Sequence, residues 1–275
     1  MRRVYILGWI VIIVLSLAGC TSPESDEPVP TMVDLTRLPT ERFLRENAPP
    51  AGWESLALDP IDRLLPQHHQ SWTYTITGSF EGTYSDTGEP AAGEFEAIVL
   101  VNEVGQAQRV LLSAEGDAFL SNEVLLKLEG VRFSNDYYVV DINGRCSHDE
   151  TSGTAVADLG AGQLIGGVGR AVYTGHRQEI EGHPVWLYTF TPGDVRLPAI
   201  HRTPDSVVAL AADLWAAPDL NAVLLYTVTA SVERVTLLWA DQAEPKLVSG
   251  TLYLRYELSI PDLNVPPNIS IPNGC

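Results

Sequence analysis

The chain has 275 residues, of which 35 are Asp or Glu and only 17 are Lys or Arg, so its formal net charge is −18 at pH 7. A chain this acidic is repelled by nucleic acids and by anionic lipid head groups, which excludes polyanions as partners. The charge is scattered, and we expect it to keep the protein soluble and monomeric. The hydrophobic fraction of 45% is enough for a large buried core, and the frequent Val, Leu, Thr and Tyr are typical of sheet proteins.

Residues 1–19 have the three parts of an export signal: basic Arg2 and Arg3, an apolar run from Val4 to Leu17, and small residues before Cys20. The run is shorter than the roughly 20 residues that cross a bilayer as a helix, so a permanent span is the weaker interpretation. The ending Leu-Ala-Gly-Cys resembles the lipobox of bacterial lipoproteins. The resemblance implies cleavage before Cys20, a diacylglyceryl thioether on its sulfur and a lipid anchor at the extracytoplasmic face of the cell membrane. The alternative is an ordinary secretory signal with a chance cysteine.

The lipidated cysteine is followed by a stretch that has little to bury. Residues 21–31 are acidic and rich in proline, which is typical of a disordered tether, and residues 32–58 combine scattered apolar side chains with helix-breaking prolines. We therefore assign residues 20–54 to the lipidated cysteine and its tether, and residues 55–275 to a single folded domain.

The first half of that domain predicts one helix and several strands. Asp59 as cap and Pro60 at the first helical position predict a helix over residues 59–70. The alternation of apolar and polar residues over 71–80 predicts a half-buried strand. Further strands are expected at 92–101, 107–114, 117–128, 131–134 and 136–142, with glycine or Asn-Asp between several of them.

The glycine-rich segment 151–171 interrupts this pattern. Its apolar side chains are spaced for a loose helix, and each internal glycine weakens such a helix by about 1 kcal/mol relative to alanine. The glycine spacing fits neither phosphate-binding loop pattern. We expect a mobile cover over the sheet.

The second half predicts strands at 171–182, 184–191, 212–217, 221–231, 233–240 and 247–260, and a short helix near 204–210. Two of these strands, 185–190 and 222–228, are apolar on both faces, so each must be covered on both sides or line a cavity. The last stretch, from residue 260, has too much proline for a central strand and is expected to wrap an edge. These patterns predict a mainly β (α+β) fold: one curved antiparallel sheet, a half-barrel, with short helices forming a lid.

Once Cys20 is lipidated, Cys146 and Cys275 remain in an oxidising compartment. An even pair there is most simply a structural disulfide. Two free thiols or a metal pair are the alternatives, although the sequence has no Cys-x-x-Cys spacing.

Several elements together resemble the LolA/LolB-like superfamily, especially the LppX/LprG-type lipoproteins. They are the lipobox, the acidic tether, the glycine-rich segment, the motif GHRQEIEGHPVWLYTF at 175–190 and the stretch DLWAAPDLNAVLLYTV at 213–228. The resemblance covers roughly residues 55–275 and implies an unclosed barrel with a helical lid over a pocket for acyl chains. LolA itself is soluble, so a lipidated chain departs from its shuttle role and is closer to a resident acceptor or lipid carrier.

For the pocket we select apolar side chains on one phase of three strands, with packing of a closed sandwich core as the alternative role. They are Trp186, Tyr188, Phe190, Leu224, Tyr226, Leu252, Leu254 and Leu258.

Catalytic patterns are weak in this chain. His68 and His69 are adjacent and point apart on a helix, and His148 lies beside a cysteine expected in a disulfide. The sequence has no HExxH and no Gly-x-Ser-x-Gly motif. We therefore expect no catalytic residues, no metal and no cofactor, and a membrane-anchored protein that binds lipid. The alternatives are an envelope protein–protein interaction module, which would bind through a strand edge or an acidic face, and a hydrolase on a β scaffold.

Overall fold

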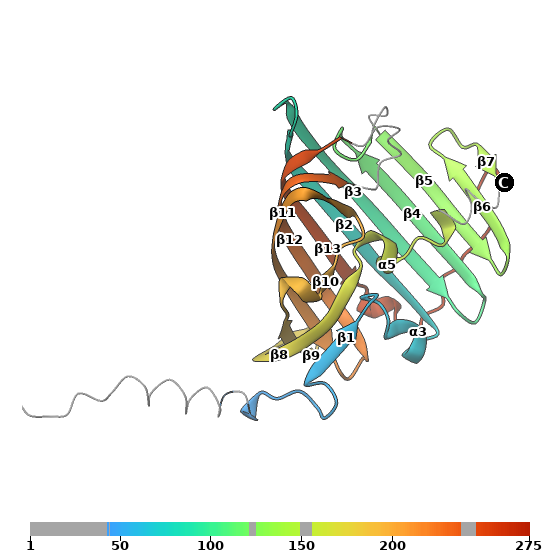
Figure 1. Cartoon of the computed structure of the whole chain (residues 1–275). Coiled ribbons are helices and arrows are strands. Elements are labelled where there is room, and N and C mark those ends of the chain that lie inside the picture. Colours follow the sequence, from blue (N-terminus) through green and yellow to red (C-terminus); the bar gives the residue numbers. More distant parts are fainter. Residues whose placement is uncertain (1–42, 44, 121–124, 149–155, 238–245) are drawn as a thin grey trace, which may run out of the picture. The chain divides into compact units, whose positions relative to one another are not determined.

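The computed structural model describes residues 43, 45–120, 125–148, 156–237 and 246–275 (Figure 1). The signal segment, Cys20 and the acidic part of the tether lie outside these residues, so the structure does not test the predictions made for them. The described residues belong to one compact unit, which begins at Phe43.

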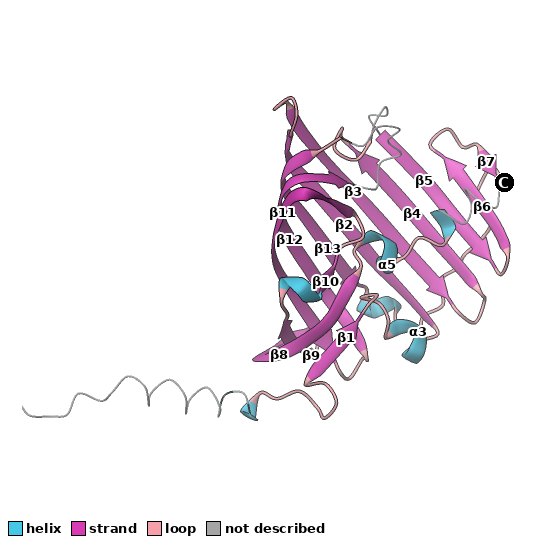
Figure 2. Cartoon of the chain, in the orientation of Figure 1, coloured by secondary structure: helices cyan, strands magenta, loops and turns pink. Residues whose placement is uncertain are grey.

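A single antiparallel sheet of 13 strands dominates this unit (Figure 2). In spatial order it runs β1-β8-β9-β11-β12-β13-β2-β3-β4-β5-β6-β7, with β10 paired to β8. The sheet is curved and does not close on itself (Figure 1), and the α-helices whose bounds lie wholly within the described residues, α3 (Leu65–His68) and α5 (Ala161–Leu164), have four residues each. This confirms the predicted fold class. The strands are β1 (Ser55–Leu58), β2 (Ser71–Tyr84), β3 (Pro90–Asn102), β4 (Ala107–Glu115), β5 (Leu125–Phe133), β6 (Asp136–Asp141), β7 (Cys146–Ser147), β8 (Gly167–Ile180), β9 (His183–Thr189), β10 (Val195–Arg196), β11 (Ile200–Ala217), β12 (Ala222–Leu237) and β13 (Val248–Leu258).

The two faces of the sheet follow from the alternation in β2. Its even-numbered side chains, such as Ile76 and Phe80, are buried, whereas Thr75 and Thr77 on the opposite face are only half-buried. Directly opposite residues of neighbouring strands lie on the same face. We call the face of Ile76 the inner face and the face of Thr77 the outer face. The core consists of inner-face side chains together with the segments that lie over them.

The helix expected at 204–210 is wrong, because β11 runs unbroken as a strand through these residues. Strand β11 pairs with β12 on both sides of an irregularity between Arg202 and Val207. Pro204, which lacks a backbone N–H, lies inside that irregularity, where no ladder hydrogen bond is required of it. Long-range pairing thus decides the conformation of a segment whose local sequence favours a helix start.

The helix expected at 59–70 is also largely wrong, since only Leu65–His68 is helical. The backbone before it is engaged elsewhere: Leu58 pairs with Val168, and the Ile61 amide donates to the Gly166 carbonyl over 2.9 Å. Asp59 does not cap the helix but lies 3.3 Å from Nη1 of Arg196. Strand pairing with β8 therefore replaces the first helical turns.

Several boundaries in the first half differ from those expected. Residues 117–120 form a turn after Gly116, residues 121–124 lie outside the described residues, and β5 runs from 125 to 133 as one strand. In the cover region, helical structure is limited to residues around α5, and residues 151–155 lie outside the described residues. Strand β8 already begins at Gly167.

The end of the predicted tether is folded against the sheet. The Trp186 indole Nε1 donates to the Asn47 carbonyl over 2.8 Å, and the Tyr188 hydroxyl donates to the Trp53 carbonyl over 2.7 Å. Pro49, between them, is buried. The compact unit therefore includes residues before 55, with Pro49 buried and Trp53 packed against the core.

The C-terminal segment connects the two halves of the sheet. The Ser259 amide donates to the Thr73 carbonyl and the Asn264 amide to the Ser71 carbonyl, each over 2.9 Å. At its other end Cys275 is disulfide-bonded to Cys146 in β7, with the two Cα atoms 5.3 Å apart, so the predicted pairing is confirmed. The segment thus extends from β2 to the β7 edge (red in Figure 1), rather than following one edge of the sheet.

Candidate functional site

Strand register places six of the eight predicted pocket residues on the inner face: Trp186, Tyr188, Tyr226, Leu252, Leu254 and Leu258. Tyr188 and Tyr226 lie on either side of Leu214, and Tyr256 is next to Tyr226. Leu224 lies at an irregularity in the pairing of β11 with β12, and Phe190 follows the end of β9. Seven of the eight are at most 6% exposed, and Phe190 is half-buried with its ring centroid 6.1 Å from that of Tyr226. All eight belong to one packed cluster or pack against it.

Residues 156–165, which we call the cover, lie over the inner face. Ala157, Ala161, Leu164 and Ile165 are all buried. The cover approaches β5 closely at Gly130, where an added Cβ would stand 2.8 Å from both the Ala157 nitrogen and Cγ1 of Val156. A glycine in the middle of this strand is therefore required by the close approach of another backbone.

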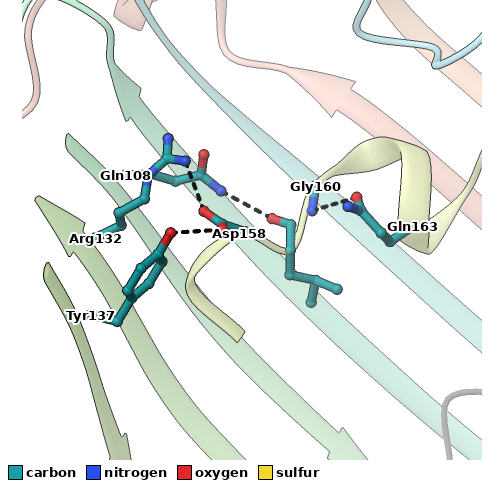
Figure 3. Close-up of polar contacts among 7 residues, drawn as sticks. Gln108, Arg132, Tyr137, Asp158, Gly160 and Gln163 are labelled. Carbon is teal, nitrogen blue, oxygen red and sulfur yellow. Dashed lines mark hydrogen bonds and ion pairs between the residues drawn. The ribbon is translucent and has the colours of Figure 1, made fainter. Parts of the chain in front are cut away.

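Polar contacts fasten the cover to strands β4, β5 and β6 (Figure 3). Arg132 Nη1 lies 2.8 Å from Asp158 Oδ1, and the Tyr137 hydroxyl donates to Asp158 Oδ2 over 3.3 Å. One residue further, Gln108 Nε2 donates to the Leu159 carbonyl over 3.2 Å. The Arg132–Asp158 pair is about one-third exposed on each side, where an ion pair contributes at most about 1 kcal/mol. The cover is thus held by a few modest polar contacts in addition to its four buried apolar side chains.

Tyr74 joins the cover to the sheet from the other side. Its hydroxyl accepts a hydrogen bond from the Ala161 amide over 3.1 Å and donates to the Asp62 carboxyl group. Burial raises the pKa of Asp62, an effect partly opposed by hydrogen bonds from its own backbone and from Tyr74. Burial, together with the nearby Asp62 charge, also raises the pKa of Tyr74 well above its usual value. A buried polar junction therefore lies within an otherwise apolar face.

This junction predicts a pH effect. The pKa of Asp62 is higher in the folded state than its ordinary value of 3.8. The contribution of Asp62 to stability therefore falls as pH rises from the ordinary pKa through the raised pKa. Asp62→Asn keeps an acceptor for Tyr74 without a charge. We expect its free energy of unfolding, measured by urea titration, to fall less between pH 3 and pH 7 than that of the wild type. If the free energies of unfolding of the variant and the wild type changed equally between pH 3 and pH 7, this expectation would be contradicted.

Two tyrosines next to this junction have hydroxyl groups without a partner. Tyr226 on β12 and Tyr256 on β13 are directly opposite each other, and both are fully buried. Among the described residues, neither hydroxyl has a hydrogen-bond partner, and the same is true of the Trp72 indole nitrogen. Burial raises the pKa of both tyrosines, so both hydroxyls stay protonated and able to donate at neutral pH. The sequence shows where these rings lie but gives no sign that their hydroxyls lack partners.

Three grooves lie on the outer face, and none of the eight predicted residues lines them. One of them is about 630 Å³, and its lining includes Glu94, Glu96, Glu115, Lys127 and Tyr253. Glu94 and Glu115 are directly opposite each other, which places like charges side by side. Two neighbouring grooves are about 450 and 410 Å³. The alternation of Glu94 and Glu96 is visible in the sequence, but the groove depends on the curvature of the sheet.

The histidines considered for chemistry have separate partners. His183 Nδ1 lies 2.8 Å from Asp219 Oδ2, whereas His69 accepts from Asn264 and donates to the Leu220 carbonyl. His148 lies 3.5 Å from the Cys146 sulfur, which is already in the disulfide and is therefore not a thiolate. In the part of the chain that the structure describes, no helix is both long and apolar enough to span a bilayer.

Comparisons with known proteins add little to this picture. No family model and no curated protein matches the chain. Nine chains of solved structures match it, among them a DUF1329 family protein from Desulfovibrio piger that is 11% identical. That match covers 74% of this chain and 88% of the other, with a TM-score of 0.22. Such a slight likeness carries no argument about function.

Proposed function

We propose that this protein is a lipoprotein, anchored through Cys20 to the extracytoplasmic face of the cell membrane, that binds or carries acyl chains without chemistry. The supporting observation is the open sheet, whose apolar inner face is overlaid by short segments instead of a second sheet. Lipid binding to this face also agrees with the resemblance of the motifs at 175–190 and 213–228 to those of the LolA/LolB-like superfamily.

The proposed binding event replaces the cover by hydrocarbon. Inner-face leucines of β4 and β5, such as Leu112 and Leu126, are only half-buried with the cover in place. A chain of methylene groups that covered them would contribute about 0.8 kcal/mol for each buried CH2. The exchange breaks the partly exposed Arg132–Asp158 pair and the Gln108–Leu159 hydrogen bond, each of which contributes about 1 kcal/mol. It also gives up the burial of the cover's four apolar side chains, which the ligand hydrocarbon must outweigh.

Native mass spectrometry tests this function. Residues 21–275, exported and purified without added lipid, are expected to carry co-purified lipid. Leu126→Asp places a charge on the inner face and is expected to lower lipid occupancy at least tenfold, since burying an unpaired carboxylate under hydrocarbon is strongly unfavourable. The matched control is Leu125→Asp, whose side chain is on the outer face of the same strand and 36% exposed, and which is expected to keep its lipid.

Absence of lipid from the wild-type protein, or equal occupancy in both variants, would refute the lipid-binding proposal. Membrane attachment is judged separately by cell fractionation, in which Cys20→Ser is expected to release the full chain. Retention of that variant on membranes would mean that the apolar segment itself is the anchor.

The acidic outer-face groove favours a second candidate function, that of an envelope interaction module. Glu94, Glu96 and Glu115 line it, and Lys127 is the single basic residue in its lining. Such a surface would attract a basic protein segment. Cross-linking in cells separates the two functions, because a lipid carrier needs no stoichiometric protein partner.

A further inference from the structure

Buried tyrosine hydroxyls almost always have a hydrogen-bond partner, because an unsatisfied hydroxyl retains its full desolvation cost. Tyr226 and Tyr256 depart from this rule together, on adjacent strands and at directly opposite positions. Among the described residues, neither hydroxyl makes a hydrogen bond: the ring of Phe190 lies beside Tyr226, and the hydroxyl of Tyr74, whose ring centroid lies 5.1 Å from that of Tyr256, bonds with the Ala161 amide and Asp62 instead. Two donors therefore stand side by side in an apolar face without acceptors.

We propose that the hydroxyls of Tyr226 and Tyr256 form a subsite that donates hydrogen bonds to an uncharged oxygen acceptor of the ligand, such as the carbonyl of an acyl ester. This inference rests on the proposed lipid-binding function and deepens it, because it states which part of the ligand is recognised and where. The acyl chains would lie on the apolar inner face on either side of the subsite.

The surroundings of the pair favour a neutral acceptor over a carboxylate. Asp62 acts electrostatically on both Tyr74 and Tyr256, and its side chain is half-buried. A second carboxylate brought into this environment would meet like charge in a medium of low dielectric constant. An ester carbonyl accepts the same hydrogen bonds and carries no charge. The subsite therefore selects acyl esters over free fatty acids.

The position of the subsite also relates it to the cover. Tyr74 stands beside Tyr256 and holds the Ala161 amide at the start of α5. A ligand oxygen bound to the tyrosine pair would thus lie next to the point where the cover is attached to β2. Movement of the cover then exposes the leucines of β4 and β5 and releases the Ala161 amide from Tyr74, the neighbour of Tyr256.

The test compares three ligands that share a hydrocarbon chain of the same length: methyl oleate, oleate and 1-octadecene. Their affinities for the full chain in non-ionic detergent are measured by native mass spectrometry at pH 8. The wild type is expected to bind methyl oleate more tightly than either of the others. Tyr226→Phe/Tyr256→Phe is expected to weaken methyl oleate binding about tenfold, which is the scale of one or two lost hydrogen bonds, and to leave 1-octadecene binding unchanged.

Tyr84→Phe is the matched control. Tyr84 is also buried and on the inner face, but its hydroxyl already donates to the Asp117 carbonyl, so its removal should leave the ratio of the ester and alkene affinities unchanged. The double variant removes two unsatisfied hydroxyls, and its unfolding midpoint in urea is expected to be equal to or higher than that of the wild type. A lower midpoint would mean that the hydroxyls have protein or water partners, and it would overturn the inference.

The remaining outcomes separate the two proposals. If the wild type binds all three ligands equally and the double variant does the same, the subsite is refuted while lipid binding stands. If oleate binds as tightly as methyl oleate, the preference for an uncharged acceptor is refuted. If none of the three ligands binds, the proposed function fails and the subsite fails with it.

Discussion

Removing the Cys146–Cys275 disulfide is expected to lower the free energy of unfolding by up to about 5 kcal/mol, because the bond closes a loop over a sequence separation of 129 residues. The bond restricts the unfolded chain, and it also joins the C-terminal segment to β7. Cys146→Ser/Cys275→Ser should therefore unfold at a lower urea concentration than the wild type. Amide hydrogen exchange should also become faster in residues 263–275.

A reduced wild-type sample is the control for this prediction. Unfolding in the presence of excess dithiothreitol should reproduce the midpoint of the double serine variant. A decrease of less than 1 kcal/mol in the free energy of unfolding would contradict the prediction. It would mean that the hydrogen bonds of Ser259 and Asn264 to β2 position the C-terminal segment by themselves.

Gly250→Ala is expected to destabilise the fold by about 3 kcal/mol or more, or to prevent folding. Gly250 in β13 lies opposite Gly82 in β2, at a place where these central strands come unusually close. A Cβ at residue 250 would stand 2.2 Å from the Glu81 carbonyl oxygen and 2.6 Å from the Gly82 Cα. Both atoms belong to the backbone, so relief would require the two strands to separate.

Gly169→Ala is the matched control for Gly250→Ala. Gly169 is also in a strand, and its backbone conformation is one that any residue can adopt. The nearest atom to its added Cβ would be the Asp194 carbonyl oxygen at 3.6 Å, which is ordinary contact. We expect its urea unfolding midpoint to equal that of the wild type or to exceed it slightly, because alanine restricts the unfolded chain. Equal midpoints for the two alanine variants would show that β2 and β13 can separate at little cost.

The alternation of apolar and polar residues made much of the sheet predictable. It is a local signal, and it identified the strands from 71 to 80 and from 251 to 258 together with the buried phase of each. Six of the eight residues selected for the pocket lie on the inner face for the same reason. The disulfide could be predicted because only two cysteines remain once Cys20 is set aside.

The errors occur where long-range contacts override local preference. Residues 204–210 start like a helix and become part of β11, because β12 supplies hydrogen bonds along nearly its whole length. Residues 59–64 have a cap and a proline suited to a helix, but their backbone bonds to the segment around Gly166. Residues 45–54 are assigned to the tether from their composition, but the Asn47 and Trp53 carbonyls accept hydrogen bonds from side chains of β9.

The sequence by itself determined the phases of several strands and the cysteine pair, because each of these is encoded in neighbouring residues or in a simple count. Only the tertiary structure decided that Tyr226 and Tyr256 stand side by side without acceptors, that Asp158 fastens the cover, and that the described grooves lie on the outer face. These features depend on which strands pair, in which register and with what curvature. Pairing and curvature are set by contacts between residues far apart in the chain, and a local pattern does not contain them.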